Sequence, residues 1–173
     1  AAMMANAYAR LTGKAGVCSA ASGPATMNLV SGVAHAYADS APIIAMGGAS
    51  PISQFHSEVF QEIDQLSIMR PATKWAAQAV SARRIPEYIN MAYRQALTGR
   101  LGPAYLDLPG DVLYARVDEE TVGWPQPART AHRIPGDPGL VKEAVDLLSR
   151  ADRPLIVTGS GILWSNASEE LQQ

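Results

Sequence analysis

The chain has 173 residues, 47% of them hydrophobic, and is long enough for one complete domain and part of another. It carries 14 basic and 16 acidic side chains, which gives a net charge of −2. This balance argues against nucleic acid and against an anionic membrane as partners, because both select clustered Lys and Arg.

Helix and strand patterns alternate along the chain, which predicts an α/β fold with a mainly parallel sheet and helices on both faces. The first helix is expected to run to Leu11 and to be stopped by Gly13. A strand follows over 17–20. The Gly23-Pro24 turn then starts a helix that continues through Tyr37.

The middle of the chain continues this alternation. The next strand is expected over 42–46, and the glycine pair 47–48 ends it at the same sheet edge as Gly23. A polar loop then leads to a short helix over 60–66. A weak strand is predicted near 75–80.

One more helix and one more strand complete the first domain. Pro86 suits the first turn of a helix that Gly99 closes, because the apolar positions between them recur at spacings of three and four. The strand over 104–108 ends at the Pro109-Gly110 pair. We therefore expect the first domain to cover residues 1–117.

A change in composition marks the domain boundary. The proline-rich stretch 124–129, followed by two further prolines, is typical of an interdomain linker, which we place at 118–137. Residues 138–173 are expected to begin a second α/β domain. It would contain a helix with one apolar face and then a buried strand over 154–158.

Both ends of the sequence are typical of the interior of a longer chain. Residues 1–11 favour a helix with no capping residue ahead of it, and residues 165–173 supply a serine cap and stop after about one turn. We expect the sequence to be an excerpt of a larger polypeptide.

The remaining global features indicate a cytoplasmic protein. The single cysteine, Cys18, lies in an expected strand, which excludes a disulfide framework and favours a reducing compartment. No apolar run approaches the length of about 20 residues that spans a bilayer, and no signal-like start occurs.

Several enzyme classes lack their motifs in this sequence. There is neither the GxSxG of serine hydrolases nor the Walker pattern of phosphate-binding loops. No metal site is proposed, because no HxxxH or CxxC spacing occurs and the histidines, His35, His56 and His132, are scattered. The stretch 159–161 resembles the start of a dinucleotide fingerprint, but Trp164 stands where the third glycine belongs.

The small-residue turn 22–28 is the most informative stretch of the chain. A strand that passes through Gly23-Pro24 directly into a helix leaves free backbone N–H groups and room for a flat ligand. Open α/β folds bind small molecules at that edge of the sheet. The turn therefore predicts a ligand pocket.

Phe60 and Gln61 follow the polar loop and allow two interpretations. They begin a short helix capped by charges, or they project into the cleft, where an amide would hydrogen-bond a carbonyl or hydroxyl of a small-molecule substrate. Asp107, near the end of a strand, is either a cleft residue or a salt-bridge partner, and the structural role is favoured.

Five short stretches resemble motifs of thiamine-diphosphate-dependent enzymes of the acetolactate synthase group, and they follow one another in the same order as in that family. They are residues 22–28, 39–43, 60–64, 102–112 and 153–157. The chain thus resembles this family over nearly its whole length. Residues 63–65 and 71–76 are most similar to benzaldehyde lyase and the 2-hydroxyacyl-CoA lyases.

The resemblance implies that residues up to about 117 form the domain that holds the aminopyrimidine of thiamine diphosphate. The residues that match the family's cofactor contacts are Gly23, Pro24 and Asn28, and those that match its substrate side are Phe60 and Gln61. Ala25 departs from the pattern, because many relatives have glycine there.

The resemblance also implies parts that this sequence does not contain. The family's catalytic Glu, which contacts the pyrimidine, would lie just before Ala1, so no catalytic residue is assigned within the chain. The diphosphate and Mg²⁺ would be bound by a third domain outside it. In the family two subunits face each other at the site, which implies a homodimer or homotetramer of the full-length protein.

The implied function is part of a lyase, carboligase or decarboxylase that acts on 2-keto acids, 2-hydroxyacyl-CoA or acyloins. This segment would supply the aminopyrimidine side of the site and would not be active alone. Two alternatives stay open: a non-catalytic nucleotide-binding or regulatory α/β module that uses the same turn, and a purely structural remnant.

Overall fold

A computed structural model describes residues 1–126 and 135–173 of the chain. The chain divides into two compact units, residues 1–129 and 130–173. The division falls within the predicted linker 118–137, of which residues 127–134 lie outside the described residues.

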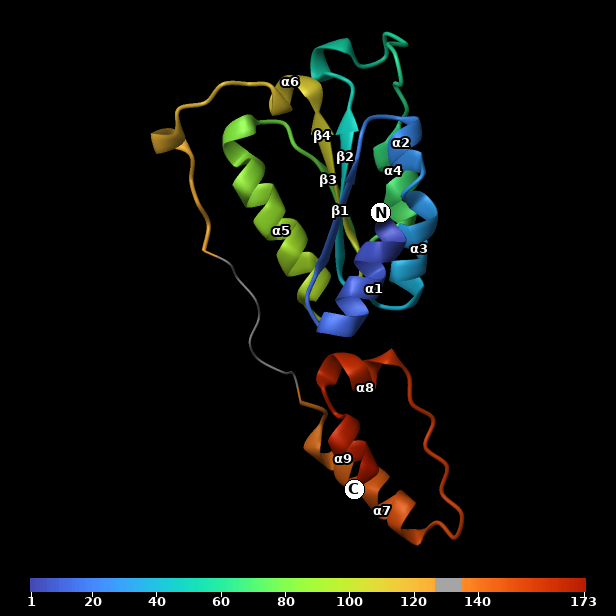
Figure 1. Cartoon of the computed structure of the whole chain (residues 1–173). Helices are drawn as coiled ribbons and strands as arrows, with labels where there is room; N and C mark the ends of the chain where they lie inside the picture. The colour runs from blue at the N-terminus through green and yellow to red at the C-terminus, as the bar shows by residue number, and fades with distance from the viewer. Residues whose placement is uncertain (127–134) are drawn as a thin grey trace. The chain divides into compact units, whose positions relative to one another are not determined.

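The first unit is built on a four-stranded sheet in which every neighbouring pair of strands is parallel (Figure 1). The strand order is β1-β2-β4-β3, so β1 and β2 are neighbours and β4 lies between β2 and β3. The strands are β1 (Gly16–Ala20), β2 (Ile43–Ala49), β3 (Trp75–Gln78) and β4 (Ala104–Pro109). The predicted α/β fold with a parallel sheet is confirmed.

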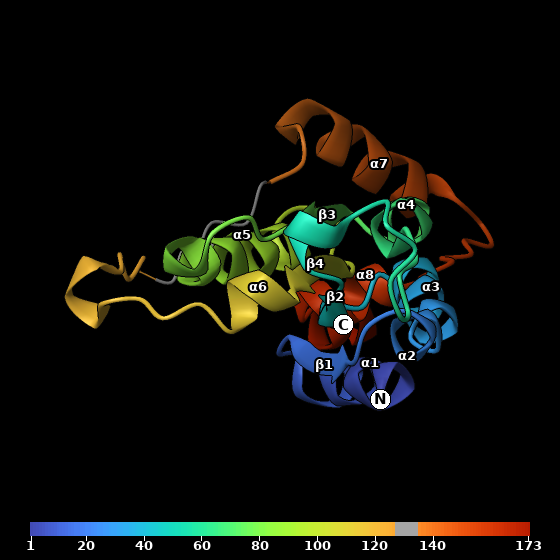
Figure 2. The same cartoon turned by 90° about the horizontal axis from the view of Figure 1, so that it is seen from above.

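Helices cover both faces of this sheet (Figures 1 and 2). On one face lie α1 (Ala2–Thr12) and α3 (Val30–Ala38), and on the other lies α5 (Ile85–Leu97). Short helices connect the layers: α2 (Pro24–Met27), α4 (Gln65–Met69) and α6 (Gly110–Leu113). Single turns of 3₁₀ helix occur at Ile52–Gln54, Arg70–Ala72, Ala82–Arg84 and Glu119–Thr121.

The two central strands, β2 and β4, form the core of this unit. Ile43, Tyr105 and Leu106 are completely buried, because helices cover both sides of these strands. On the α5 face, Ala92 and Ala96 pack against Ile44 and Ala104 of the sheet. Their small side chains let the helix lie close to the strands.

The element boundaries differ from the predictions in three places. The helix expected from Phe60 begins only at Gln65, because the Asp64 carboxylate accepts a hydrogen bond from the Ser67 backbone N–H (3.1 Å) and caps α4. Strand β2 continues to Ala49, since its glycines also pair with β4. The single helix expected after the turn is divided into α2 and α3, with Asn28 as the C-cap of the first.

The second unit contains three helices among its described residues: α7 (Pro138–Arg150), α8 (Ser160–Ser165) and α9 (Ser168–Gln172). The strand predicted over 154–158 is wrong for this structure, because no strand in the described part of the unit pairs with it. Leu155 and Val157 are accordingly 85% and 87% exposed.

Candidate functional site

The carboxyl ends of β1, β2 and β4 meet at one edge of the sheet, at the top of Figure 1, and a cavity of about 390 Å³ lies there. Most of its lining is apolar and small. The lining comes from residues 19–22 at the end of β1, from Met46, Gly48 and Ala49 of β2, and from Leu108 of β4 and Gly110, Leu113 and Tyr114 of α6 and its C-cap. We call it the carboxyl-edge cavity; its size is typical of small-molecule sites.

Gly23 makes the turn between β1 and α2. Its backbone has φ +60°, a left-handed conformation that favours glycine, and a Cβ at this position would collide with the Gln61 carbonyl oxygen. The Gly23 N–H donates to Gln65 Oε1 (3.0 Å), and Pro24 has no N–H. The free N–H expected at this turn is therefore not found at Gly23. The turn consequently offers fewer free backbone N–H donors to a phosphate.

A buried hydrogen-bond network lies behind the turn. Gln65, Tyr105 and Asp107 are 2%, 0% and 2% exposed. The Tyr105 hydroxyl donates to Asp107 Oδ1 (2.6 Å), and Gln65 Nε2 contacts the Gly48 carbonyl (2.6 Å), the Tyr105 hydroxyl (3.0 Å) and Asp107 Oδ1. Gln78 Nε2 donates to the other Asp107 oxygen (2.8 Å). The network thus joins β2, β3, β4 and the turn.

Asp107 has neutral partners in this network. The described part of the chain gives Asp107 no salt bridge; its side-chain partners there are a phenol and two amides, which does not support the salt-bridge alternative. Burial, and then the adjacent Asp107 carboxylate, raise the pKa of Tyr105 above the ordinary tyrosine value. Tyr105 therefore remains a protonated hydrogen-bond donor at neutral pH.

The loop before α4 has an unusual backbone. His56, Glu58 and Gln61 all have φ between 52° and 65°, in the left-handed region that non-glycine residues rarely adopt. The Glu62 carboxylate accepts the backbone N–H groups of His56 (2.6 Å) and Val59 (3.2 Å) and holds this conformation. The His56 bond is the main cause that lowers the pKa of Glu62. Strained backbone of this kind concentrates at functional sites.

The structure brings only some of the predicted site residues together. Gln61 lies at the turn, where its Oε1 accepts a hydrogen bond from the Ser22 hydroxyl (3.2 Å). Pro24 and Asn28 are exposed on α2, and Phe60 is 87% exposed. None of these four residues lines the carboxyl-edge cavity, whereas Ser22, next to Gly23, does. Their roles in binding stay predictions.

Sequence reasoning did not identify Gln65 and Tyr105. One signal was present: Tyr105 and Asp107 alternate along a strand and so point to the same face of the sheet. Nothing local indicates that Gln65, 42 residues from Asp107, reaches the same point.

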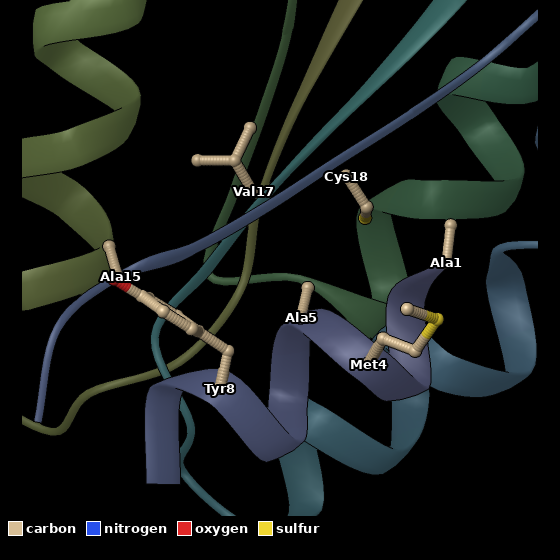
Figure 3. Close-up of a pocket in the computed structure, with 7 residues that line it drawn as sticks. All are labelled: Ala1, Met4, Ala5, Tyr8, Ala15, Val17 and Cys18. Carbon is tan, nitrogen blue, oxygen red and sulfur yellow. The ribbon is translucent and has the colours of Figure 1, made fainter. Parts of the chain in front are cut away.

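A second cavity, of about 640 Å³, lies between α1 and β1 (Figure 3). Its side chains are mostly apolar, and Tyr8 reaches along it toward Ala15. Among the described residues β1 pairs only with β2, so this cavity follows the other side of the strand. It lies apart from the predicted site residues, and we place the candidate site at the carboxyl-edge cavity.

Two further searches cover the part of the chain that the structure describes. No three or more His, Cys, Asp or Glu side chains in it gather closely enough to hold a metal ion. None of its helices has both the length and the apolar character needed to cross a membrane.

The fold and the cavity define an α/β domain with a candidate small-molecule site at the carboxyl edge of its parallel sheet. Residues 1–68 match the family described as "Thiamine pyrophosphate enzyme, N-terminal TPP binding domain". At this level the resemblance to thiamine-diphosphate enzymes is confirmed. The benzaldehyde lyase and 2-hydroxyacyl-CoA lyase branch is not, and it stays a prediction.

Individual relatives cover the whole chain. It is 42% identical over 176 residues to a probable acetolactate synthase large subunit of Methanocaldococcus jannaschii, an alignment that covers 99% of this chain and 29% of the relative. It is 38% identical over 175 residues to an acetolactate synthase of Arthrospira platensis (100% and 30%). It is 35% identical over 176 residues to a glyoxylate carboligase of Escherichia coli O157:H7 (98% and 28%). The chain spans less than a third of each of these relatives.

Proposed function

We propose that this chain is part of a thiamine-diphosphate-dependent enzyme that acts on 2-keto acids, and that its first unit binds the aminopyrimidine half of the cofactor. The observation that carries the proposal is the carboxyl-edge cavity, formed in part by residues 19–22 at the end of β1, within the region that matches the cofactor-binding family. As a 173-residue chain it would not be active alone.

The cavity suits a flat heteroaromatic ring. Ala20, Ala21, Gly48 and Ala49 give it thin walls, and the leucines of β4 and α6 supply apolar contact. One buried polar atom is available nearby: Ser50 is 8% exposed, and its hydroxyl has no hydrogen-bond partner among the described residues. Such a group would be satisfied by a polar edge of the bound ring.

The chain's own residues would bind and orient the cofactor. By the family resemblance, Gly23, Pro24 and Asn28 would contact the ring, and Gln61, which accepts from Ser22, would face the substrate. Of this part of the chain, Ser22 is the residue that lines the cavity in this structure. The apolar walls would exclude water from the ring, which strengthens each polar contact made there. When bound, thiamine diphosphate would supply a nucleophilic carbon and, in its thiazolium ring, an electron sink for making or breaking a carbon–carbon bond.

We favour carboligation of 2-keto acids as the reaction. The support is the names of the relatives, acetolactate synthase and glyoxylate carboligase, each similar to nearly all of this chain. The same cofactor chemistry also supports lyase and decarboxylase reactions, on 2-hydroxyacyl-CoA or acyloins, and these reactions are the alternatives to carboligation.

The rest of the assembly is proposed on the family resemblance. The diphosphate and its Mg²⁺ would be held by another domain of the full-length protein, and a Glu outside this sequence would contact the pyrimidine. We propose a cytoplasmic homodimer or homotetramer, in which the aminopyrimidine side of one subunit faces the diphosphate side of another.

The test uses the full-length protein that contains this chain, titrated with thiamine diphosphate and Mg²⁺ by isothermal calorimetry and assayed with pyruvate and glyoxylate. We expect binding and carbon–carbon bond formation. Asn28→Ala and Gln61→Ala should each weaken cofactor binding or turnover by about tenfold, the value of one lost hydrogen bond.

The matched control is Gln95→Ala, because Gln95 is an exposed glutamine on α5. It should change neither quantity. Absence of cofactor binding by the wild-type protein would contradict the proposal. Submillimolar nucleotide binding in its place would favour the regulatory module, and unchanged binding and turnover in both site variants would favour the structural remnant.

A further inference from the structure

Gln65 is the first residue of α4 and is almost completely buried, with an exposed fraction of 2%. Its carboxamide contacts four groups from three parts of the chain. Oε1 faces the N–H of Gly23 in the turn, and Nε2 faces the Gly48 carbonyl of β2 and the Tyr105 and Asp107 oxygens of β4.

Only one orientation of this amide satisfies these partners. The Gly48 carbonyl and the Asp107 carboxylate are acceptors, so they need the NH₂ group. The Tyr105 hydroxyl donates its hydrogen to Asp107, so it faces Gln65 Nε2 as an acceptor, and the two hydrogens of the amide are shared among these three acceptors. A rotated amide would put its NH₂ against the N–H of Gly23 and its oxygen against these acceptors. The carboxylate of Asp107 thus determines which end of the Gln65 amide meets the turn.

Gln65 joins the turn after β1 to the end of β2, where the turn lies against Gly48 beside the carboxyl-edge cavity. Gly48 lines the cavity directly, and Gly23 adjoins Ser22, which also lines it. Two other side-chain hydrogen bonds hold the turn, from the Ser22 hydroxyl to Gln61 (3.2 Å) and from the Thr26 hydroxyl to the Ala21 carbonyl (2.7 Å). Among these side chains, only Gln65 joins the turn to β2 and β4, because its amide also contacts Gly48, Tyr105 and Asp107.

We propose that Gln65 is a positioning residue for cofactor binding. Its amide, oriented by Asp107 and Tyr105, holds the turn 22–24 against the end of β2, and so fixes the part of the cavity wall that Ser22 and Gly48 form for a flat pyrimidine ring. Gln65 itself does not line the cavity and touches neither cofactor nor substrate. This inference rests on the proposed binding of thiamine diphosphate by the first unit.

The test compares Gln65→Met with Thr73→Val in the full-length protein. The first variant removes all contacts of the amide at similar volume. The second is matched, because Thr73 is also buried, at 8% exposure, and its hydroxyl donates to the Met69 carbonyl at the end of α4 (2.9 Å), away from the turn.

We expect Gln65→Met to raise the Kd for thiamine diphosphate about tenfold or more, while kcat at saturating cofactor changes less than about threefold. Thr73→Val should leave both unchanged. Equal Kd values for wild type and Gln65→Met would overturn the proposal, as would equal losses of affinity in the two variants.

A second variant, Gln65→Glu, keeps an oxygen for Gly23 but places a carboxyl group beside Asp107. We expect its cofactor affinity to approach that of the wild type at low pH, where the new carboxyl is protonated and donates to Asp107, and to fall as the pH rises. This profile also decides the matter if Gln65→Met does not fold. A pH dependence identical to that of the wild type would overturn the proposal.

Hydrogen exchange separates this inference from the proposed function. In peptides covering the turn, exchange should be faster in Gln65→Met than in wild type or Thr73→Val without any ligand. If the wild-type protein binds no thiamine diphosphate, the proposed function fails and the affinity claim fails with it. Unchanged exchange alongside normal cofactor binding in the wild type would overturn the positioning role alone.

Discussion

At the scale of single residues, Gly23 and Gly13 share a positive φ, +60° and +67°, but differ in ψ, −119° and 11°, and in their surroundings. A Cβ on Gly13 would meet no atom within 4 Å, whereas one on Gly23 would collide with the Gln61 carbonyl oxygen. We expect Gly13→Ala to cost about 1 kcal/mol of unfolding free energy, the backbone effect alone. Gly23→Ala should cost about 1–3 kcal/mol more, because neighbouring backbone must move.

Urea unfolding of both glycine variants, followed by circular dichroism, measures this difference. Equal losses of stability would mean that the turn moves away from Gln61 without cost, in contradiction to the close approach seen at Gly23.

Tyr105 gives a prediction about pH. Because burial raises its pKa in the folded chain, the folded state keeps the phenol proton after the unfolded chain has lost it. The stability from this group is complete below the unfolded pKa of 10.0, and it decreases as the pH rises above that value. The decrease should be about 1.4 kcal/mol per pH unit.

The Tyr105→Phe variant should lack this decrease of unfolding free energy at high pH, because phenylalanine has no proton to lose. At neutral pH the variant should be about 1–3 kcal/mol less stable, because Gln65 loses an acceptor and Asp107 loses a donor. The stability difference should narrow between pH values of about 10 and 11. Unfolding free energies of both proteins across this range test the claim, and a constant difference would contradict it.

At the scale of elements, Lys74 closes the C-terminal end of α5. Its ammonium group donates to the backbone carbonyls of Gln95 (2.6 Å), in the last turn of the helix, and of Thr98 (2.7 Å), its C-cap. Partial burial lowers the pKa of Lys74. We expect Lys74→Met to destabilise the chain by about 1–2 kcal/mol.

The control is Lys14→Met, because Lys14 is exposed in the loop between α1 and β1. Thermal unfolding should show a loss for the first variant only. Similar melting temperatures for the two would show that the carbonyls of α5 are satisfied equally well without the ammonium group.

The elements also show how far sequence reasoning reaches. Alternating patterns predicted the strands and the long helices of the first unit, because periodicity and glycine positions are local signals. The strand expected over 154–158 was wrong, because an apolar run becomes a strand only beside a partner. The helix start at Gln65 depended on the Asp64 cap, which the aromatic and amide residues before it did not indicate.

The candidate site also contains one feature that the sequence predicts and one that it does not. The turn at Gly23 can be predicted from the sequence, since glycine and proline determine the conformation of their own backbone. The network of Gln65, Tyr105 and Asp107 joins positions up to 42 residues apart, and it requires the order β1-β2-β4-β3, which places β4 beside β2. Nothing in a single local pattern encodes that neighbourhood.

At the scale of the whole molecule, the two units differ in how much apolar surface they bury. The first has a sheet covered on both faces, with Ile43, Tyr105 and Leu106 fully buried. In the second, Leu140 and Leu147 of α7 are 67% and 66% exposed. Since burial of apolar surface is the main favourable term in folding, the first unit should account for most of the chain's stability.

We therefore expect residues 1–126 alone to fold, and to unfold at a denaturant concentration close to that of the 173-residue chain. Residues 135–173 alone should show weak helical signal and no cooperative transition, because an exposed amphipathic helix of 13 residues is marginal without packing. Chemical unfolding of the two fragments and the chain measures this. A shorter fragment that fails to fold would place part of the first unit's core in residues after 126, and would move the domain boundary toward the C-terminus.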